Sequence, residues 1–323
     1  MNETMNKVKN ALLSMQRFSW EQGVAARAMF RLGDNEMGIL MAKEAVHRQV
    51  ADGRLAIMGD NFVASDPGAN GIPVQKAAQL TGDLSFTKAA EKMADYYLHH
   101  ARRTADGTIK HTSGLGGEEW RWMDDIVMID ALYHIMPFLA AAGYPDESMK
   151  QFYGFKRHLY DEDKHLYHHM WDEKTGEFHR AAFWSGDSGW AVCACVWTYE
   201  FLPASFVQYR SDLKQHLKEL VPAMLSYVGE SGLFHDVIDD PTTHLDGTSG
   251  LMLAFGIYEA VRLGLLDKRY ERDASALIDA ATANIDEYGI LQKVTGAPSF
   301  DFQGSSAEAQ AFYLLACAAR ENA

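Results

Sequence analysis

Two kinds of helical segment alternate along this chain, and the alternation limits its possible folds more than any other feature. Amphipathic segments with one charged face are predicted at residues 2–17, 36–51, 83–103, 145–159, 210–228 and 268–287. Segments that are apolar on most faces follow them, at residues 20–33, 70–81, 122–142, 188–202, 249–261 and 307–319. A helix that is apolar all round is buried all round, whereas an amphipathic helix covers a core with one face. The order therefore predicts inner helices surrounded by outer ones.

A second repeat gives the spacing of these helix pairs. A short turn follows most amphipathic segments, and its glycine, or the residue in its place, falls at positions 53, 107, 164, 232 and 289. The intervals are 54, 57, 68 and 57 residues, and a regular period of this size indicates a repeat architecture. We therefore predict an all-α fold, an (α/α)6 barrel of six helical hairpins with short β segments in its loops, as one catalytic domain over residues 1–323. An open solenoid is the alternative, but it would leave a polar edge on every helix, which residues 188–202 do not show.

Composition and charge exclude several classes of function. The net charge of −14 argues against binding a nucleic-acid backbone, although it permits a small anionic ligand held by local cations. No apolar run of about 18 residues is present, so no membrane-spanning segment is predicted. The N-terminus lacks the pattern of a signal peptide, and the three cysteines form no disulfide framework or paired zinc motif. We expect a cytoplasmic protein, monomeric or weakly self-associating, with no nucleic-acid or membrane partner.

The inner helices of such a barrel run parallel, so their N-termini gather at one end, which we call the mouth. The segments that enter these helices contain five of the seven tryptophans, namely Trp20, Trp120, Trp122, Trp184 and Trp190. Indole rings can pack on the C–H faces of sugars, and carboxylates can bind sugar hydroxyls or transfer protons. Helix N-termini add a positive potential. We therefore expect the mouth to bind a small anionic oligosaccharide, with Trp20 among the contacting residues.

Two adjacent carboxylates, Asp124 and Asp125, open the apolar segment 122–142. Acidic residues are common in the first turn of a helix, where they complement its dipole, but two of them entering a nearly apolar helix are unusual. Partial burial raises the pKa of a carboxyl group, which suits a general acid/base, and we assign this role to Asp124. Asp66, which precedes Pro67, is either a turn residue or a second carboxylate at the mouth.

Other polar residues near the predicted mouth suit structural roles. His168 and His169 lie in an extended segment, where one side chain points inward and the other outward. Ser305 and Glu308 have the spacing of a capping box. Residues 235–246 hold two histidines and four aspartates, but their spacing matches no metal-ligand template. We therefore expect a polar loop there, and no metal or cofactor.

Several stretches resemble the unsaturated uronyl hydrolases, in particular the unsaturated rhamnogalacturonyl hydrolases of glycoside hydrolase family 105 and the related family 88. The resemblance runs from SWEQGVAARAMFRLGD near the start to SSAEAQAFYLLA near the end. Trp122-x-Asp124-x-x-x-Met128 is similar to the W-x-D-x-x-x-M of that family, which gives Asp124 the place of the catalytic acid/base. The resemblance also implies substrate-binding roles for Asp66, His111, Trp122, His169 and Trp190.

The sequence departs from the pattern of this family in two stretches. The stretch W-S-G-D-S-G-W at 184–190 resembles W-x-R-G-N-G-W, but Gly186 replaces an arginine and Ser188 an asparagine. Gly247 stands before Thr248, where a glutamate is usual. The missing arginine concerns the subclass of substrate rather than the reaction.

The resemblance implies a substrate with a Δ4,5-unsaturated uronic acid at its non-reducing end, as polysaccharide lyases produce. The reaction is then hydration of a vinyl ether. Asp124 protonates C4, and water activated by the same carboxylate adds at C5. The hemiketal opens and releases the next sugar. Asp66 binds ring hydroxyls and tunes Asp124.

The sequence alone leaves three other functions open. An inverting glycosidase needs two carboxylates about 6.5–9.5 Å apart with water between them, and Asp66 and Asp124 are candidates. A sugar epimerase would use paired histidines, His169 with His111 or His235, as acid and base. A non-catalytic helical scaffold would bind no sugar tightly and would tolerate Asp124→Asn.

Overall fold

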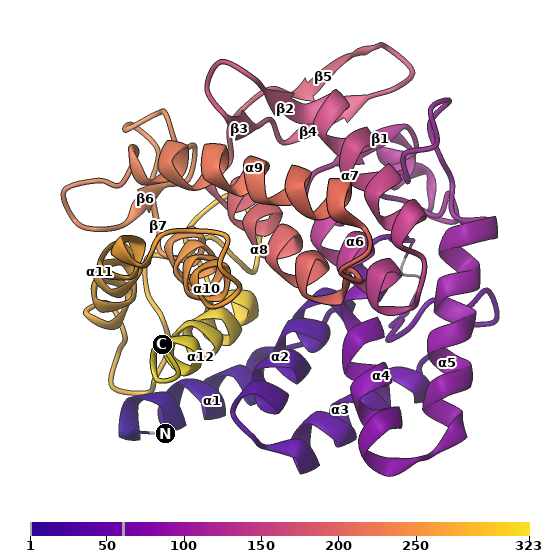
Figure 1. Cartoon of the computed structure of the whole chain (residues 1–323), viewed down its shortest axis with the longest axis horizontal. Helices are drawn as coiled ribbons and strands as arrows, with labels where there is room; N and C mark the ends of the chain where they lie inside the picture. Colours follow the sequence, from indigo (N-terminus) through magenta and orange to yellow (C-terminus); the bar gives the residue numbers. More distant parts are fainter. Residues whose placement is uncertain (1, 60–61) are drawn as a thin grey trace.

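The computed structural model describes residues 2–59 and 62–323, and its centre is a closed ring of inner helices (Figure 1). Each inner helix contacts the next, and the last contacts the first. The ring consists of α2 (Ser19–Arg31), α4 (Gly71–Thr81), α6 (Ala131–Ala141), α8 (Ser185–Phe201), α10 (Thr248–Arg262) and α12 (Ala307–Arg320). The outer helices are α1 (Glu3–Met15), α3 (Asn35–His47), α5 (Leu84–Asp95), α7 (Pro145–Leu159), α9 (Val207–Leu225) and α11 (Glu271–Thr282). The predicted (α/α)6 barrel is confirmed.

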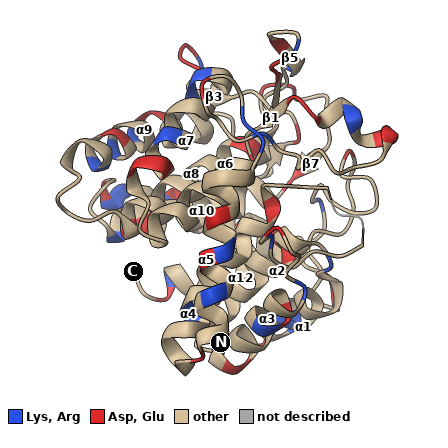
Figure 2. Cartoon of the chain, turned by 90° about the vertical axis from the view of Figure 1, so that its right-hand side faces the viewer, with Lys and Arg blue, Asp and Glu red and all other residues tan. Residues whose placement is uncertain are grey.

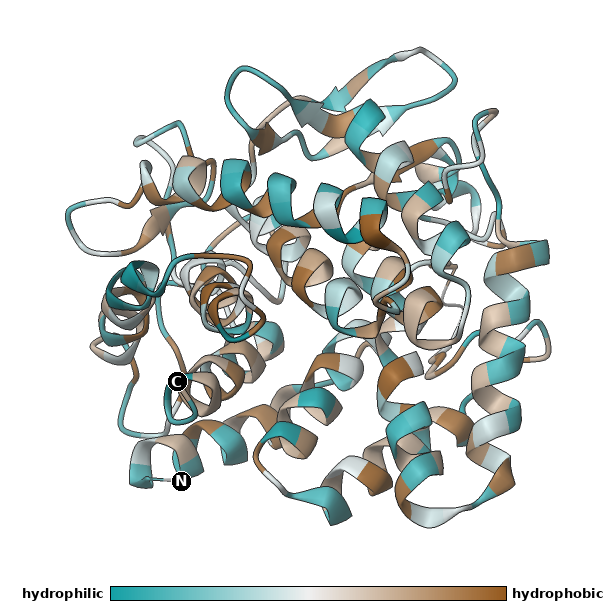
Figure 3. Cartoon of the chain, in the orientation of Figure 1, coloured by the Kyte–Doolittle hydropathy of each residue, from teal (hydrophilic) through white to brown (hydrophobic). Residues whose placement is uncertain are grey.

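Burial explains why the two sets of helices differ in sequence. Every residue of α6 from 131 to 140 is buried, whereas α11 buries only Ala274, Leu277, Ile278 and Ala281. That spacing forms one stripe along a helix, so α11 covers the ring with one face. In Figure 3, α11 is largely hydrophilic and the neighbouring α10 is more hydrophobic. Figure 2 shows acidic and basic residues on α3, α7 and α9, while α6 carries almost none.

Short elements connect the helices. Four are tight helical turns: η1 (Asp66–Asn70), η2 (Tyr96–His100, a π-helix), η3 (Glu118–Met123) and η4 (Lys268–Tyr270). The strands are β1 (Ile126–Met128), β2 (Tyr160–Asp161), β3 (Leu166–Tyr167), β4 (Met170–Asp172), β5 (Glu177–Arg180), β6 (Phe234–His235) and β7 (Leu245–Asp246). Strands β2 and β3 pair with each other, as do β6 and β7.

The largest of these sheets has the strand order β1-β4-β5 and is antiparallel. Val127 of β1 faces Trp171 of β4, and Met170 faces Arg180 of β5 across an irregular register. Because β1 leads into α6 and β5 leads toward α8, the sheet belongs to the mouth. It brings segments more than 40 residues apart in sequence to the entry of the ring.

One predicted helix is wrong in its first part. Residues 122–142 were expected to be helical throughout, but α6 begins only at Ala131, and Ile126–Met128 form β1. These three residues are apolar and fully buried, and a short apolar run does not distinguish a strand from a buried helix. Asp124 and Asp125 therefore precede a strand rather than open a helix.

Close backbone contact fixes η1 against the ring. A Cβ on Gly23 of α2 would lie 2.5 Å from the carbonyl carbon of Ala69 in η1. A Cβ on Gly71 would lie 2.1 Å from the ring of Phe138 in α6. Only glycine permits these approaches, and they position Asp66 between α2 and α6. In the described part of the chain, no helix is both long and apolar enough to cross a membrane.

Candidate active site

Each inner helix begins with a carboxyl group at the mouth. Most of these groups are buried, and Asp130 is partly exposed. They are Glu21 in α2, Asp66 in the η1 turn before α4, Asp130 before α6, Asp187 in α8, Asp246 before α10 and Glu308 in α12. Helix N-termini stabilise negative charge, but burial opposes it. The mouth is therefore acidic, and its carboxyl groups differ in how readily they ionise.

Asp66 lies in a buried hydrogen-bond chain. The Ser65 hydroxyl donates to Asp66 Oδ1 over 3.0 Å and lies 2.9 Å from His111 Nδ1. Because that hydroxyl has one proton to give, His111 Nδ1 must donate to Ser65. Burial raises the pKa of Asp66 to about 6; His111 opposes this shift, and the negative charge of Asp130 adds to it. A carboxyl group with this pKa holds or releases a proton near neutral pH.

Asp130 is the N-cap residue of α6. Its carboxylate accepts a 2.7 Å hydrogen bond from the backbone N–H of Ala131. The negative charge of Asp130 raises the pKa values of Asp66, His169 and Asp187, although burial has the larger effect on each of them. Asp130 therefore lies among these three groups while remaining partly open to solvent.

His169 and Asp187 form a buried pair. His169 Nδ1 lies 2.8 Å from Asp187 Oδ1. Burial lowers the pKa of the His169 imidazole to about 4 and raises the pKa of Asp187 well above its usual range. Near pH 7 the imidazole and the carboxyl group are therefore both neutral, and each carries one proton. His168 packs instead between Phe178 and Phe183, so the two histidines point to different sides as predicted.

The structure does not place Asp124 or Asp125 in this group. Asp124 lies 3.0 Å from Arg102 and accepts a 3.3 Å hydrogen bond from Thr112. Asp125 pairs with the buried Lys110 at 2.7 Å, and that hydrogen bond lowers the pKa of Asp125. Both carboxylates lie just before β1, and each forms an ion pair, Asp124 with Arg102 and Asp125 with Lys110. Asp124 is partly buried, as expected, but it does not lie on a helix, because α6 starts seven residues later.

The tryptophans divide into two groups. Trp20 stacks on Phe18 and Trp122 stacks on His179 of β5, and Trp122 is 45% exposed, as a sugar-contacting ring would be. Trp190 is only 3% exposed and packs on Tyr133 and His134 inside the ring. The substrate-binding role that the resemblance implies for Trp190 is therefore corrected, because the buried ring packs beneath the mouth and is not exposed to a ligand.

Sequence comparison identifies the family. The model of glycosyl hydrolase family 88 matches residues 1–314. The chain belongs to glycosyl hydrolase family 88. An unsaturated rhamnogalacturonyl hydrolase of Bacillus subtilis (strain 168) is 26% identical over 287 residues, which cover 86% of this chain and 79% of that protein.

Solved structures share the fold of this family 88 member. A family 105 glycoside hydrolase from C. acetobutylicum superposes with a TM-score of 0.82 at 17% identity, covering 100% of both chains. A possible family 105 member from Salmonella enterica has a TM-score of 0.81 at 20% identity and covers 99% of this chain and 93% of its own. An unsaturated glucuronyl hydrolase specific for heparin has a TM-score of 0.72 at 12% identity, covering 99% and 95%.

The structure explains why this hydrolase has glycine at position 186. A Cβ there would lie 2.7 Å from the ring of Trp184, whose indole N–H donates to Asp236 over 2.9 Å. Trp184 thus occupies the space that a side chain at 186 would need. A different cation is nearby, since Arg180 of β5 lies 3.9 Å from Asp236 and its charge acts on the His169–Asp187 pair.

Two further expectations concern the remaining inner helices. The cap of α12 is Ser306, which accepts from the N–H of Ala309, so the predicted capping by Ser305 is wrong by one residue. Glu308 is buried, and burial raises its pKa to about 8, with a further contribution from Glu21. The loop 235–246 is polar and forms hydrogen bonds, and no cluster suited to a metal ion occurs among the described residues.

Sequence reasoning missed Asp130 and Asp187 in this hydrolase. A signal for Asp130 was present, because an aspartate directly before the apolar run 131–140 is a typical N-cap. The predicted helix over residues 122–142 obscured this signal, because it placed Asp130 inside the helix instead of at its start. No comparable signal marked Asp187, since its importance comes from contact with His169, eighteen residues away in sequence.

Proposed function

We propose that this glycoside hydrolase removes a Δ4,5-unsaturated uronic acid from the non-reducing end of oligosaccharides. The observation that carries the proposal is the Asp66–Asp130 pair, in which burial and a neighbouring charge raise the pKa of Asp66 to about 6. An acid with a pKa near 6 exchanges protons readily just below neutral pH, which suits a site that must protonate a carbon–carbon double bond. The Bacillus subtilis relative, named an unsaturated rhamnogalacturonyl hydrolase, supports this substrate class.

Asp130 takes the role of acid/base that the sequence assigned to Asp124. It is partly exposed, so substrate and water can reach it, whereas Asp66 is only 5% exposed and its Oδ1 already accepts from Ser65. In the proposed reaction Asp130 gives its proton to C4, and its carboxylate then takes a proton from the water that adds at C5. The C5–ring-oxygen bond of the resulting hemiketal opens to a ketone, and the neighbouring sugar leaves from C1. Asp66 binds the ring hydroxyls, and its raised pKa makes it a local source of protons.

The remaining mouth residues bind the sugar. We assign the substrate carboxylate to Arg180, because it is the cation next to the His169–Asp187 pair. Trp122 and Trp20 provide aromatic surfaces. His111 and His169 offer their Nε2 atoms, since their Nδ1 atoms are bonded to Ser65 and Asp187. A paired-histidine epimerase also needs a protonated histidine near pH 7, and His169, with a pKa of about 4, is a poor candidate for that acid.

Further properties follow as proposals. The closed contact of α12 with α2 supports one catalytic domain over residues 1–323. All three cysteines are buried and free, which suits a reducing compartment such as the cytoplasm. We propose a monomer or weak homo-oligomer, as the acidic composition favours.

An absorbance assay tests the substrate class. The conjugated double bond of an unsaturated uronate absorbs in the near ultraviolet, and its hydration removes that absorbance. Unsaturated disaccharides prepared by lyases from rhamnogalacturonan and from a glycosaminoglycan are compared with their saturated counterparts. We expect loss of absorbance on an unsaturated substrate, fastest with the rhamnogalacturonan product. Release of sugar from the saturated compounds alone would instead indicate an inverting glycosidase.

A further inference from the structure

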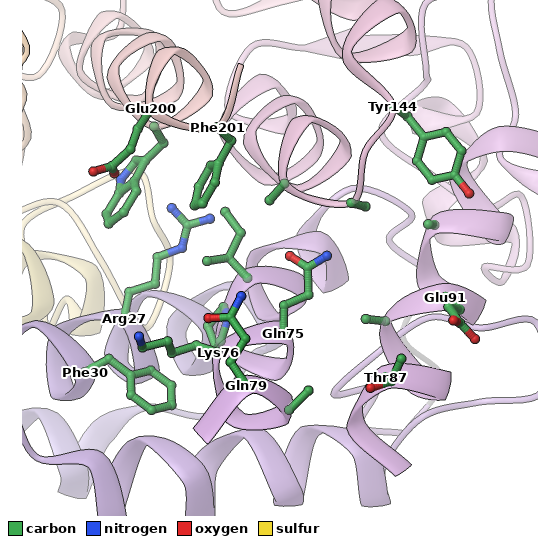
Figure 4. Close-up of a pocket in the computed structure, with 18 of the residues that line it drawn as sticks. Arg27, Phe30, Gln75, Lys76, Gln79, Thr87, Glu91, Tyr144, Glu200 and Phe201 are labelled. Carbon is green, nitrogen blue, oxygen red and sulfur yellow. The ribbon is translucent and has the colours of Figure 1, made fainter. Parts of the chain in front are cut away.

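A cavity of about 690 Å³ lies at the end of the barrel opposite the mouth (Figure 4). It is lined by residues toward the C-terminal ends of α2, α6 and α8 and by one side each of α4 and α5. None of the mouth carboxyl groups lines it. Cavities of roughly 300–1,000 Å³ take small-molecule ligands, so its size fits a sugar derivative.

The side chain of Arg27 points into this cavity, and its guanidinium donors have no hydrogen-bond acceptor among the described residues. Figure 4 shows its side chain reaching from α2 into the space between Phe201 and Gln75. The residue is 3% exposed, and its guanidinium carbon lies 5.0 Å from the ring centre of Tyr133 and 4.6 Å from that of Trp197. Stacking on rings uses the face of a guanidinium and leaves its in-plane N–H donors free. Among the described residues, none accepts a hydrogen bond from its three nitrogens.

Two more buried donors in the same cavity lack acceptors. Within the described ranges, neither the indole nitrogen of Trp197 nor the Nε atom of Arg31 has a hydrogen-bond partner. Indole and guanidinium groups donate hydrogen bonds and cannot accept them. A buried donor without an acceptor destabilises the fold, because it loses its hydrogen bonds to water and gains none in return. Three donor-only side chains around one cavity therefore match a ligand that brings acceptors.

The charges at the cavity favour an anion. Lys76 is exposed at the rim, and no carboxylate of the described chain lies within ion-pair distance of it. Of the two lining acids, Glu200 is paired with Arg262 at 2.6 Å, and Glu91 lies at the exposed edge. The charge of Arg27 therefore has no full counter-ion. Burial lowers the pKa of Arg27, and the opposing contributions come from Tyr133 and Cys193 and, least of all, from Glu200.

The remaining lining residues indicate the body of the ligand. The aromatic side chains of Phe30 and Phe201 give apolar walls, while Gln75, Gln79 and Thr87 offer amide and hydroxyl groups. A sugar, which presents both C–H and hydroxyl groups, suits such a mixed surface. We propose that this cavity is a second ligand site, which binds a small sugar acid or sugar phosphate with its anionic group on Arg27.

Thermal shift and fluorescence titrations test the site. The probes are gluconate, glucose 6-phosphate and neutral glucose, at constant ionic strength. We expect one or both anions to raise the Tm of the wild-type protein by several degrees, and glucose to leave it unchanged. The anions should also change the fluorescence of Trp197, and Trp197→Phe should remove that change. The tighter anion identifies the group as carboxylate or phosphate.

Variants locate the binding. Arg27→Met should weaken anion binding at least tenfold, and Lys76→Gln should weaken it severalfold. Lys218→Gln, an exposed lysine on α9, is the matched control and should bind as the wild type does. Without ligand, Arg27→Met should melt no lower than the wild type, because it removes an unpartnered charge; a purely structural arginine would lower the Tm.

Several results would overturn the proposal. One is the absence of any shift with either anion. Others are an equal shift with glucose, or unchanged affinity in both the Arg27 and Lys76 variants. If Arg27→Met does not fold, Arg27→Lys and Lys76→Gln decide instead, since a lysine lacks the planar fork and should still bind more than tenfold less tightly.

Discussion

At the scale of single residues, the neighbours of a carboxyl group decide what it can do. Asp124, Asp125 and Asp130 are close in sequence, but two of them are held by Arg102 and Lys110. A carboxylate paired with a cation stays ionised and is a poor proton donor. Asp130 lies beside other carboxyl groups instead, and its charge contributes to the raised pKa of Asp66. Among these three aspartates, only Asp130 has no ion pair within the described part of the chain, so proton transfer is assigned to it.

Arg180 gives a prediction at this scale. Since it is assigned to bind the substrate carboxylate in both ground and transition states, Arg180→Gln should raise KM about 10–100-fold with little change in kcat. Arg180→Lys should recover part of the loss. Steady-state kinetics on the unsaturated disaccharide measures both constants. An unchanged KM in Arg180→Gln would remove Arg180 from the binding site.

At the scale of elements, close packing of helices and turns sets the position of the site. Gly23→Ala would bring a Cβ to 2.5 Å from the backbone of Ala69, so η1 and Asp66 must shift. We expect a loss of about 1–3 kcal/mol in the free energy of unfolding, together with reduced kcat. Gly250→Ala in α10 is the control, because its Cβ has no neighbour closer than 3.4 Å. Denaturant unfolding and an activity assay measure both effects. Equal stability and equal activity of the two variants would contradict the prediction.

The elements also show how far sequence alone reaches. Inner and outer helices were predictable because each kind carries a long periodic pattern, and α11 buries the stripe that its sequence marks. The segment that enters α6 was not predictable from the sequence, because the buried strand Ile126–Met128 pairs with β4, which lies over 40 residues further along the chain. The family resemblance named Asp66, His111 and His169, and the structure places all three among the mouth carboxyl groups, where their role stays a prediction. Asp187 depended on a contact that only the fold creates.

At the scale of the whole molecule, buried titratable groups predict how stability depends on pH. Burial raises the pKa of Glu308 to about 8, so the folded protein keeps a proton that the unfolded chain has lost. Stability then falls as pH rises toward 8. Burial lowers the pKa of His169 to about 4 and that of His216 to about 3, so stability is also lost as pH falls below the unfolded value of about 6.5.

We therefore expect the Tm to fall between roughly pH 6.5 and 8. Over this range the ionisation of Glu308 lowers the free energy of unfolding by about 2 kcal/mol. Glu308→Gln should flatten this limb, because glutamine keeps the shape of the protonated acid and does not ionise. Calorimetry across this range measures the slope in both proteins. Identical slopes would mean that Glu308 ionises as freely in the fold as in the unfolded chain.

The most direct test of the central claim compares two aspartates in the absorbance assay. Asparagine retains the N-cap acceptor at position 130, so Asp130→Asn should fold as the wild type does. We predict that Asp130→Asn lowers kcat about 10²–10⁴-fold on the unsaturated disaccharide, as expected on removing a general acid/base. Asp124→Asn should stay within a few-fold of the wild type. An inactive Asp124→Asn beside an active Asp130→Asn would contradict the account and return the reaction to the loop before β1.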